Sequence, residues 1–191
     1  MKPPLRQRKP NRMPGFDYSA CGCYFVTICI KQREMNSFGK IINGKIELSP
    51  IGEIAIKCWL EIPVHFSNIR LDDFVIMPDH VHGIVIILHN VGNANLRSLR
   101  TTIAPDQKVS IHAKKITSDR SKMLLPKIMQ NFKAAVTREI NKYPDGDFFA
   151  WQKSFYDHII HSQKELFQMR KYIHENPIRG TEEPFSMIES M

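Results

Sequence analysis

The stretch of sequence that most constrains the fold covers residues 74–88, FVIMPDHVHGIVIIL. It contains two β-branched, apolar runs separated by residues 77–79, and the second run opens with His80 and His82. Successive side chains of a strand point to opposite faces, so the two imidazoles share one face. Two imidazoles side by side can bind a divalent metal ion. We therefore expect a buried strand with a metal half-site at its beginning.

The first half of the chain adds further strand and helix signals. Residues 24–30, YFVTICI, are β-branched and aromatic, which is typical of a buried strand. Residues 39–48 carry Asn43-Gly44 between two short apolar runs, the pattern of a β-hairpin with a two-residue turn. Ser49 then suits a helix N-cap and Pro50 the first helical position. The sequence predicts a strand, a hairpin and a helix before the histidine strand.

The second half contains helices and one more strand region. Residues 122–143 place apolar side chains at helical spacing, and we expect a long helix there. Residues 148–160 give a strand region, and the last helix follows His161-Ser162 and ends at Pro177. Elements mixed in this order predict an α+β fold, a ferredoxin-like sandwich in which helices pack on an antiparallel sheet.

Charge and composition indicate the domain organisation and the class of partner. The 191 residues suffice for one domain, and the formal net charge is +8. Such a charge indicates an anionic partner, with nucleic acid first, or else a merely solvated basic surface. We expect a basic arm over residues 1–18 and a single catalytic domain over 19–180. A long basic loop at about 89–120 and a tail over 181–191 complete the chain.

Other features exclude several classes of protein. The sequence has no run of about 18 apolar residues and no apolar signal segment at its start, so neither a membrane span nor secretion is expected. The four cysteines match no zinc spacing and are interpreted as free thiols of a cytoplasmic protein. A histidine-triad nucleotide hydrolase needs a further histidine where this chain has Ile84.

The last helix brings polar residues of chemical interest. Its packing stripe contains Leu166, Met169 and Ile173. Tyr172 and Asn176 are one helical turn apart and lie on one edge of that stripe. A helix packed on the sheet would thus present a phenol and a carboxamide beside the histidine face.

Three motifs in order resemble the REP-associated tyrosine transposases, within the wider His-hydrophobic-His single-tyrosine transposase family. The motifs are MPDHVHG at residues 77–83, WQKSFYDHII at 151–160 and YIHENP at 172–177. Tyr18, YFVT at 24–27 and FKAAV at 132–136 are also similar to that family. The resemblance extends over residues 17–179.

The resemblance implies a metal-dependent endonuclease and strand transferase that acts on single-stranded DNA at hairpin-forming repeats. In that family a tyrosine attacks a DNA phosphate, becomes a 5′-phosphotyrosine and releases a 3′-hydroxyl. By motif match Tyr172 is the nucleophile, and His80, His82 and Asn176 are the metal ligands. The ion is Mg²⁺ or Mn²⁺, because two imidazoles and an amide oxygen leave positions for phosphate and water.

The family commonly has asparagine where this chain has Asp79. Its carboxylate would strengthen metal affinity, support a ligand from the outer shell or cap the turn, and turn capping is favoured. Tyr156 is interpreted as a packing residue, and His158 and His161 as surface or core histidines rather than ligands.

A different function is open on the same fold. A non-catalytic or domesticated nucleic-acid-binding module would use the basic arm and the sheet face, but would need neither Tyr172 nor Asn176. The sequence leaves the target DNA, the choice between monomer and dimer, and the physiological metal undecided.

The arm gives the first testable prediction. Five of its side chains are basic, and each phosphate contact to a single strand adds about 0.7 to the slope of log affinity against log salt. Deleting residues 1–12 should lower that slope by roughly two to three units, measured by salt titration of DNA binding. An unchanged slope would mean that the arm is only a solvated tail. The five residues are Lys2, Arg6, Arg8, Lys9 and Arg12.

Overall fold

The structure is a computed structural model and describes residues 13, 15–89, 123–143 and 149–179. The basic side chains of the expected arm, almost all of the expected loop and the expected tail lie outside these residues.

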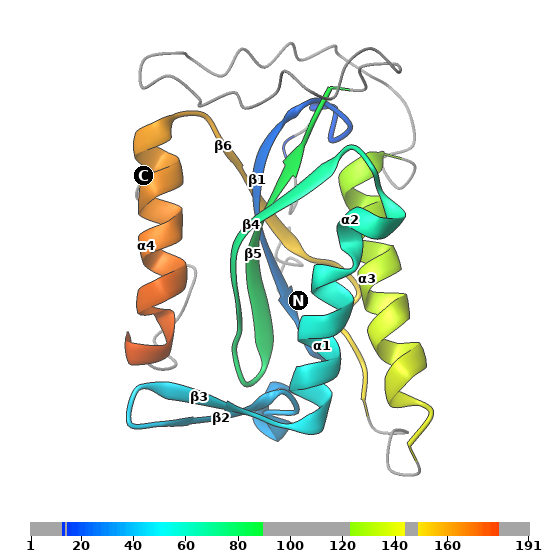
Figure 1. Ribbon diagram of the computed structural model, residues 1–191, viewed down its shortest axis with the longest axis vertical. Helices are drawn as coiled ribbons and strands as arrows, with labels where there is room; N and C mark the ends of the chain where they lie inside the picture. Colours follow the sequence, from blue (N-terminus) through cyan, green and yellow to red (C-terminus); the bar gives the residue numbers. More distant parts are fainter. Residues whose placement is uncertain (1–12, 14, 90–122, 144–148, 180–191) are drawn as a thin grey trace, which may run out of the picture.

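Four strands form the central sheet: β1 (Gly22–Cys29), β4 (Ile69–Ile76), β5 (His80–Ile87) and β6 (Tyr156–Ile160). Their order across the sheet is β4-β5-β1-β6, and every neighbouring pair is antiparallel (Figure 1). β1 and β5 are therefore the two central strands. The histidine run lies on one of them.

Helices cover both faces of this sheet (Figure 1). α1 (Pro50–Leu60), the one-turn α2 (Ile62–His65) and α3 (Leu124–Ile140) lie on one side. α4 (Gln163–Arg179) lies on the other. The chain order β1-α1-β4-β5-α3-β6 with this strand order confirms the predicted α+β, ferredoxin-like sandwich.

The predicted hairpin is a separate two-stranded sheet of β2 (Gly39–Ile42) and β3 (Lys45–Leu48). Its turn residues Asn43 and Gly44 have φ of 52° and 73°, as a two-residue hairpin turn requires. It follows the short 3₁₀ helix η1 (Arg33–Met35). Gly44 lies near Ile178 of α4, so this hairpin reaches the end of that helix.

Alternation along β5 divides its side chains between two cores. Val81 and Val85 belong to the larger core, which the sheet forms with α1 and α3. Ile84 and Ile86 belong to a smaller core against α4, together with Phe25 of β1. The face of β5 that carries His80 and His82 is therefore the face that α4 covers.

The predicted start of the first helix is confirmed. The Ser49 hydroxyl accepts a hydrogen bond from the Gly52 backbone N–H at 3.1 Å, and Pro50 follows in the first turn. The helix stops at Leu60, and Ile62 begins the separate turn α2.

Two predictions about the C-terminal half are wrong. Pro177 does not end the last helix, which continues to Arg179 and is as long as α3. A proline near a helix end removes a single backbone hydrogen bond, and the buried stripe of α4 outweighs that loss. The strand region expected over 148–160 is reduced to β6, because Trp151 makes only an isolated bridge to Ile30. Its ring packs instead against Phe132 of α3.

Two aromatic side chains shortly before β1 are part of the packed structure. Phe16 and Tyr18 are both buried, with ring centroids 5.0 Å apart. Both rings belong to the larger core.

Gly83 permits the closest approach between β5 and the helices beneath it. A Cβ atom at this position would lie 2.3 Å from Cζ2 of Trp59, which is fully buried. The glycine next to the histidine pair is thus required by the packing of α1 on the opposite face of the sheet.

Replacement of this glycine tests the contact. Gly83→Ala should lower the free energy of unfolding by about 1–3 kcal/mol, because neither the strand nor the indole can move freely. Urea unfolding measures the change. In a Trp59→Leu background the same substitution should cost much less. An equal cost in both backgrounds would contradict the proposed contact.

Candidate functional site

The two histidines converge at the start of β5. His80 is 5% exposed and His82 fully buried, and their Nε2 atoms are 2.9 Å apart. The two imidazoles thus lie together, with both rings on the face that α4 covers. Its burial comes from β1 and α4 rather than from the histidine strand itself.

The opposite nitrogen of each ring is held by an oxygen. His82 Nδ1 lies 2.8 Å from the Thr27 hydroxyl, because Thr27 is its partner in the pairing of β1 with β5. His80 Nδ1 lies 2.5 Å from Oδ1 of Asp79. A hydrogen bond at Nδ1 fixes the orientation of the ring and leaves the Nε2 atom to act as the metal ligand, as is usual for metal-binding histidines.

Two imidazole lone pairs that face each other at 2.9 Å repel unless a proton or a cation lies between them. Burial and the neighbouring His80 hold the pKa of His82 well below its usual range, so its ring is uncharged and can offer a nitrogen lone pair to a cation. The donor set therefore fits a metal ion. Two ligands about 2.1 Å from one ion and at right angles are about 3.0 Å apart, close to the observed separation.

Asp79 supports His80 instead of turning toward the Nε2 atoms. Its carboxylate contacts His80 and also accepts a hydrogen bond from Arg33. Burial alone would raise its pKa, but the contacts to His80 and Arg33 lower that pKa to about 2. The Asp79 side chain thus contacts His80 and Arg33, whereas turn capping was the favoured expectation.

Tyr172 reaches the same point from α4. Its hydroxyl lies 3.4 Å from Nε2 of His82, and the two ring centroids are 5.3 Å apart. Phe25 stacks on His82 and meets the tyrosine ring edge-on, so it orients both rings. The structure thus brings the expected nucleophile and the histidine pair together within one chain.

Asn176 lies in the buried stripe of α4, where the sequence placed it on the edge. α4 runs antiparallel to β5 (Figure 1), and Asn176 follows Tyr172 by one helical turn. The structure thus relates Asn176 to the histidines through its place on α4, one turn after Tyr172.

The other residues considered from the sequence lie elsewhere or have other contacts. His158 contacts Glu165 at 2.5 Å, and the His161 backbone N–H donates to the same carboxylate. Tyr156 is part of β6 and is half-buried. The five arm residues Lys2, Arg6, Arg8, Lys9 and Arg12 lie outside the described residues.

Sequence reasoning missed the residues that support the site, and local patterns gave no signal for them. Arg33 is 46 positions from Asp79, and Asp72 and Asp73 are about 100 positions from their partners on α4. Only Thr27 could in principle have been identified from the sequence, because it lies in the predicted first strand, where successive side chains alternate between the two faces.

Within the described part of the chain, no cluster of three or more His, Cys, Asp or Glu side chains could hold a metal. A metal at the histidine pair would thus need Asn176, water or substrate to complete its ligands. The four cysteines are free thiols, as predicted.

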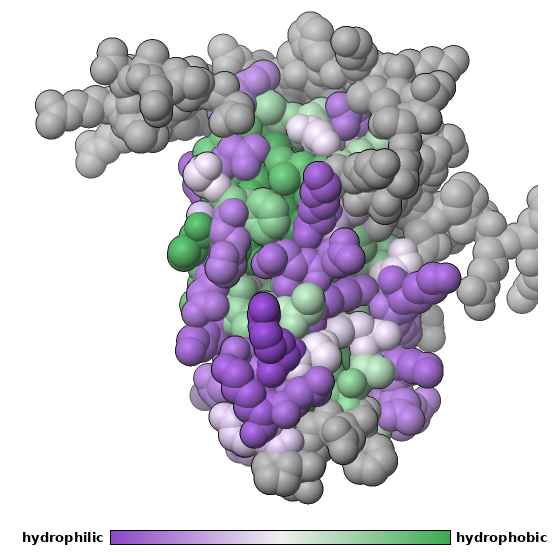
Figure 2. Space-filling model, turned by 90° about the vertical axis from the view of Figure 1, so that its right-hand side faces the viewer, coloured by the Kyte–Doolittle hydropathy of each residue, from purple (hydrophilic) through white to green (hydrophobic). Residues whose placement is uncertain are grey.

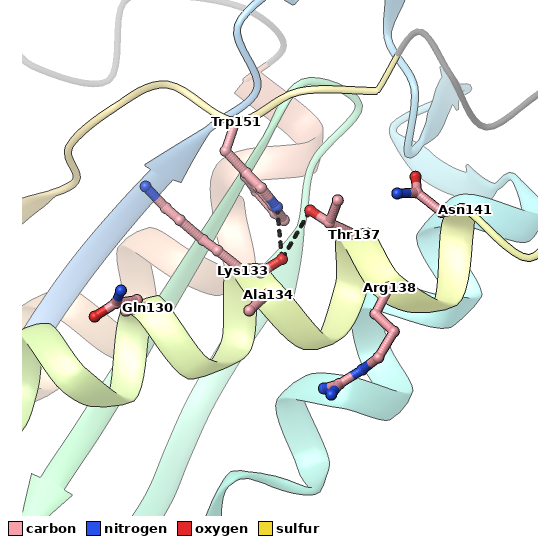
Figure 3. A pocket seen from close by; sticks show the side chains of 7 residues that line it. All are labelled: Gln130, Lys133, Ala134, Thr137, Arg138, Asn141 and Trp151. Atoms are coloured by element: carbon pink, nitrogen blue, oxygen red, sulfur yellow. Dashed lines mark hydrogen bonds between the residues drawn. The ribbon is translucent and has the colours of Figure 1, made fainter.

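The face of the molecule that carries α1 and α3 offers a different surface. Figure 2 shows that hydrophilic side chains cover most of its described lower part. A shallow pocket on α3 has Trp151 at its edge, where the indole N–H and the Thr137 hydroxyl both donate to the Lys133 carbonyl (Figure 3). This pocket lies on the opposite side of the sheet from the histidine pair.

Comparison with known proteins places the chain in a family. It is 37% identical over 176 residues to an uncharacterized protein of Haemophilus influenzae, and the match covers 91% of this chain and 90% of that protein. The chain therefore belongs to the same family as that protein. No family model matches the sequence.

The fold is shared with a solved structure of a REP-associated tyrosine transposase bound to a REP hairpin. The TM-score is 0.52 at 13% sequence identity, over 92% of this chain and 74% of the other. Among the described residues no helix is sufficiently long and apolar to cross a bilayer.

Proposed function

We propose that the protein is a metal-dependent endonuclease and strand transferase for single-stranded DNA, a tyrosine transposase in mechanism. The observation that carries the proposal is the 3.4 Å distance between the Tyr172 hydroxyl and Nε2 of His82, beside His80. The shared fold with a hairpin-bound transposase and the net charge of +8 support a DNA substrate.

In the proposed reaction the phenolic oxygen of Tyr172 attacks a backbone phosphorus. The Tyr172 Oη–P bond forms, the bond to the 3′ oxygen breaks, and the phenolic proton passes to solvent. The products are a 5′-phosphotyrosine and a 3′-hydroxyl strand end. Attack by another 3′-hydroxyl on the same phosphorus releases the tyrosine and rejoins DNA without an external energy source.

The metal ion would be held by His80, His82 and Asn176, and is Mg²⁺ or Mn²⁺. When bound, it supplies positive charge to the phosphate and stabilises the charge that develops there. Thr27 and Asp79 orient the two imidazoles, and Arg33 holds the Asp79 carboxylate. Phe25 and His82 restrict the phenol ring to a narrow range of positions.

The substrate is single-stranded DNA, and hairpin-forming repeats are the natural first choice. Two observations favour this substrate. The solved structure with the shared fold is bound to a REP hairpin, and the sequence motifs resemble those of the REP-associated tyrosine transposases. A non-catalytic binding module would not need Tyr172 beside the histidine pair. Incubation with single-stranded hairpin DNA and Mn²⁺ distinguishes the two, because only the enzyme forms a covalent protein–DNA band on a denaturing gel.

Tyr172→Phe should abolish that band, because only the attacking hydroxyl is removed and the ring still packs on Phe25. DNA binding, measured by fluorescence anisotropy, should remain within about twofold of wild type. Tyr156→Phe is the matched control and should form the adduct normally. An adduct in the Tyr172→Phe protein would show that another residue is the nucleophile.

A second prediction concerns the metal. His80→Ala or His82→Ala should eliminate Mn²⁺ binding in calorimetric titration, because one imidazole cannot replace the pair. Asn176→Ala should weaken binding less, since the carboxamide is a neutral ligand. Thr27→Val should lower affinity about 10–100-fold through loss of the Nδ1 contact, whereas Thr27→Ser should retain it. Unchanged affinity in both histidine variants would refute the metal site.

A further inference from the structure

Polar contacts attach α4, the helix that carries Tyr172, to the edge strand β4. Nε and Nη2 of Arg170 lie 2.8 and 2.6 Å from the two carboxylate oxygens of Asp72, a bidentate arrangement. One turn later, His174 Nε2 lies 2.9 Å from Asp73. Exposed ion pairs usually contribute little, but Asp72 is only 10% exposed and the bidentate geometry is the favourable one.

An irregularity in β4 makes both contacts possible. The pairing with β5 shifts register between residues 71 and 74, so Asp72 and Asp73 together face a single position of β5. In a regular strand two consecutive side chains would point to opposite faces. The bulge lets both carboxylates reach the same helix.

A second set of contacts holds the opposite side of α4. Near its start Glu165 contacts His158 of β6 at 2.5 Å, and its backbone N–H donates to the Ser162 hydroxyl. Further along the same side, Tyr172 packs on Phe25 of β1.

Helical geometry shows that these contacts oppose each other. At about 100° per residue, Arg170 and Tyr172 project about 160° apart around α4. The buried stripe lies between them, and its apolar side chains tolerate small rotations because their contacts have no direction. The apolar side chains of the stripe are Leu166, Met169 and Ile173, and the polar Asn176 is buried beside them.

We propose that these polar contacts act together as a roll lock, which prevents α4 from rotating about its own axis and so positions Tyr172 at the histidine pair of its own chain. This role rests on the function proposed above. The roll lock comprises Asp72, Asp73, Arg170 and His174 on one side, and His158 and Glu165 on the other.

Small rotations matter because the hydroxyl is far from the helix axis. At roughly 9 Å from that axis, a roll of about 10° displaces it by about 1.5 Å. A displacement of about 1 Å can reduce a catalysed rate on the order of 100-fold. The hydrogen bonds from Arg170 also hold the pKa of Asp72 below its usual range, which keeps this lock charged near neutral pH.

A pair of neutralising variants tests the lock. Arg170→Gln removes a positive charge that contacts β4, whereas Lys171→Gln removes one that, among the described residues, pairs along the helix with Glu175 at 3.6 Å. At saturating DNA and Mn²⁺, Arg170→Gln should lower the single-turnover rate of adduct formation at least 10-fold, with Mn²⁺ and DNA affinities within about threefold. Lys171→Gln should leave the rate within about twofold.

The contact with Asp72 can be tested by coupling. Asp72→Asn should lower the rate like Arg170→Gln, and the double variant should be no slower than either single variant. Arg170→Lys keeps the charge but loses the bidentate geometry, and should give an intermediate rate. It also serves as the deciding variant if Arg170→Gln does not fold. A wild-type rate in Arg170→Gln or Arg170→Lys, or an equal loss in Lys171→Gln, would overturn the proposal.

A spectroscopic measurement separates the lock from the chemistry. The Tyr172 ring lies 5.3 Å from the His82 ring, so rotation of α4 should change the chemical shifts of the His82 ring protons. We expect this change in Arg170→Gln and not in Lys171→Gln, whether or not the protein cleaves DNA. If wild type forms no adduct, the proposed function fails while this signal still tests the lock, and unchanged His82 shifts in Arg170→Gln refute the lock.

Discussion

The antiparallel pairing of β1 with β5 is the constraint on which the site depends. It sets Thr27 opposite His82 and Cys29 opposite His80. A slip of one residue in this register would turn the histidines to the face that packs on α1 and α3. The two strands are central in the sheet and buried, so apolar side chains on both faces fix the register that places these polar groups.

The site lies beside the smaller of two cores. The large core under α1 and α3 stabilises the sheet and determines positions such as Gly83, which has no space for a side chain above Trp59. The small core beneath α4 contains far fewer apolar residues. Directed polar contacts to β4 and β6 therefore matter more for this helix than for the helices on the other face.

Local sequence signals were reliable where a few neighbouring residues determine the backbone. The Asn43-Gly44 turn, the Ser49 cap and the alternation of β5 were all predicted and confirmed. Predictions failed where packing overrides a local preference. The helix continues through Pro177, and the aromatic residues before β6 pack on α3 instead of extending the strand.

The sequence by itself determined the α+β fold, the shared face of His80 and His82, and the presence of Tyr172 on an amphipathic helix. These follow from periodicity and capping, which depend on neighbouring residues. Only the tertiary structure decided that Tyr172 meets His82, that Arg33 and Asp79 support His80, and that a bulge in β4 holds α4. These contacts join residues that are distant in the chain, and strand register and helix rotation, which no local pattern specifies, bring them together.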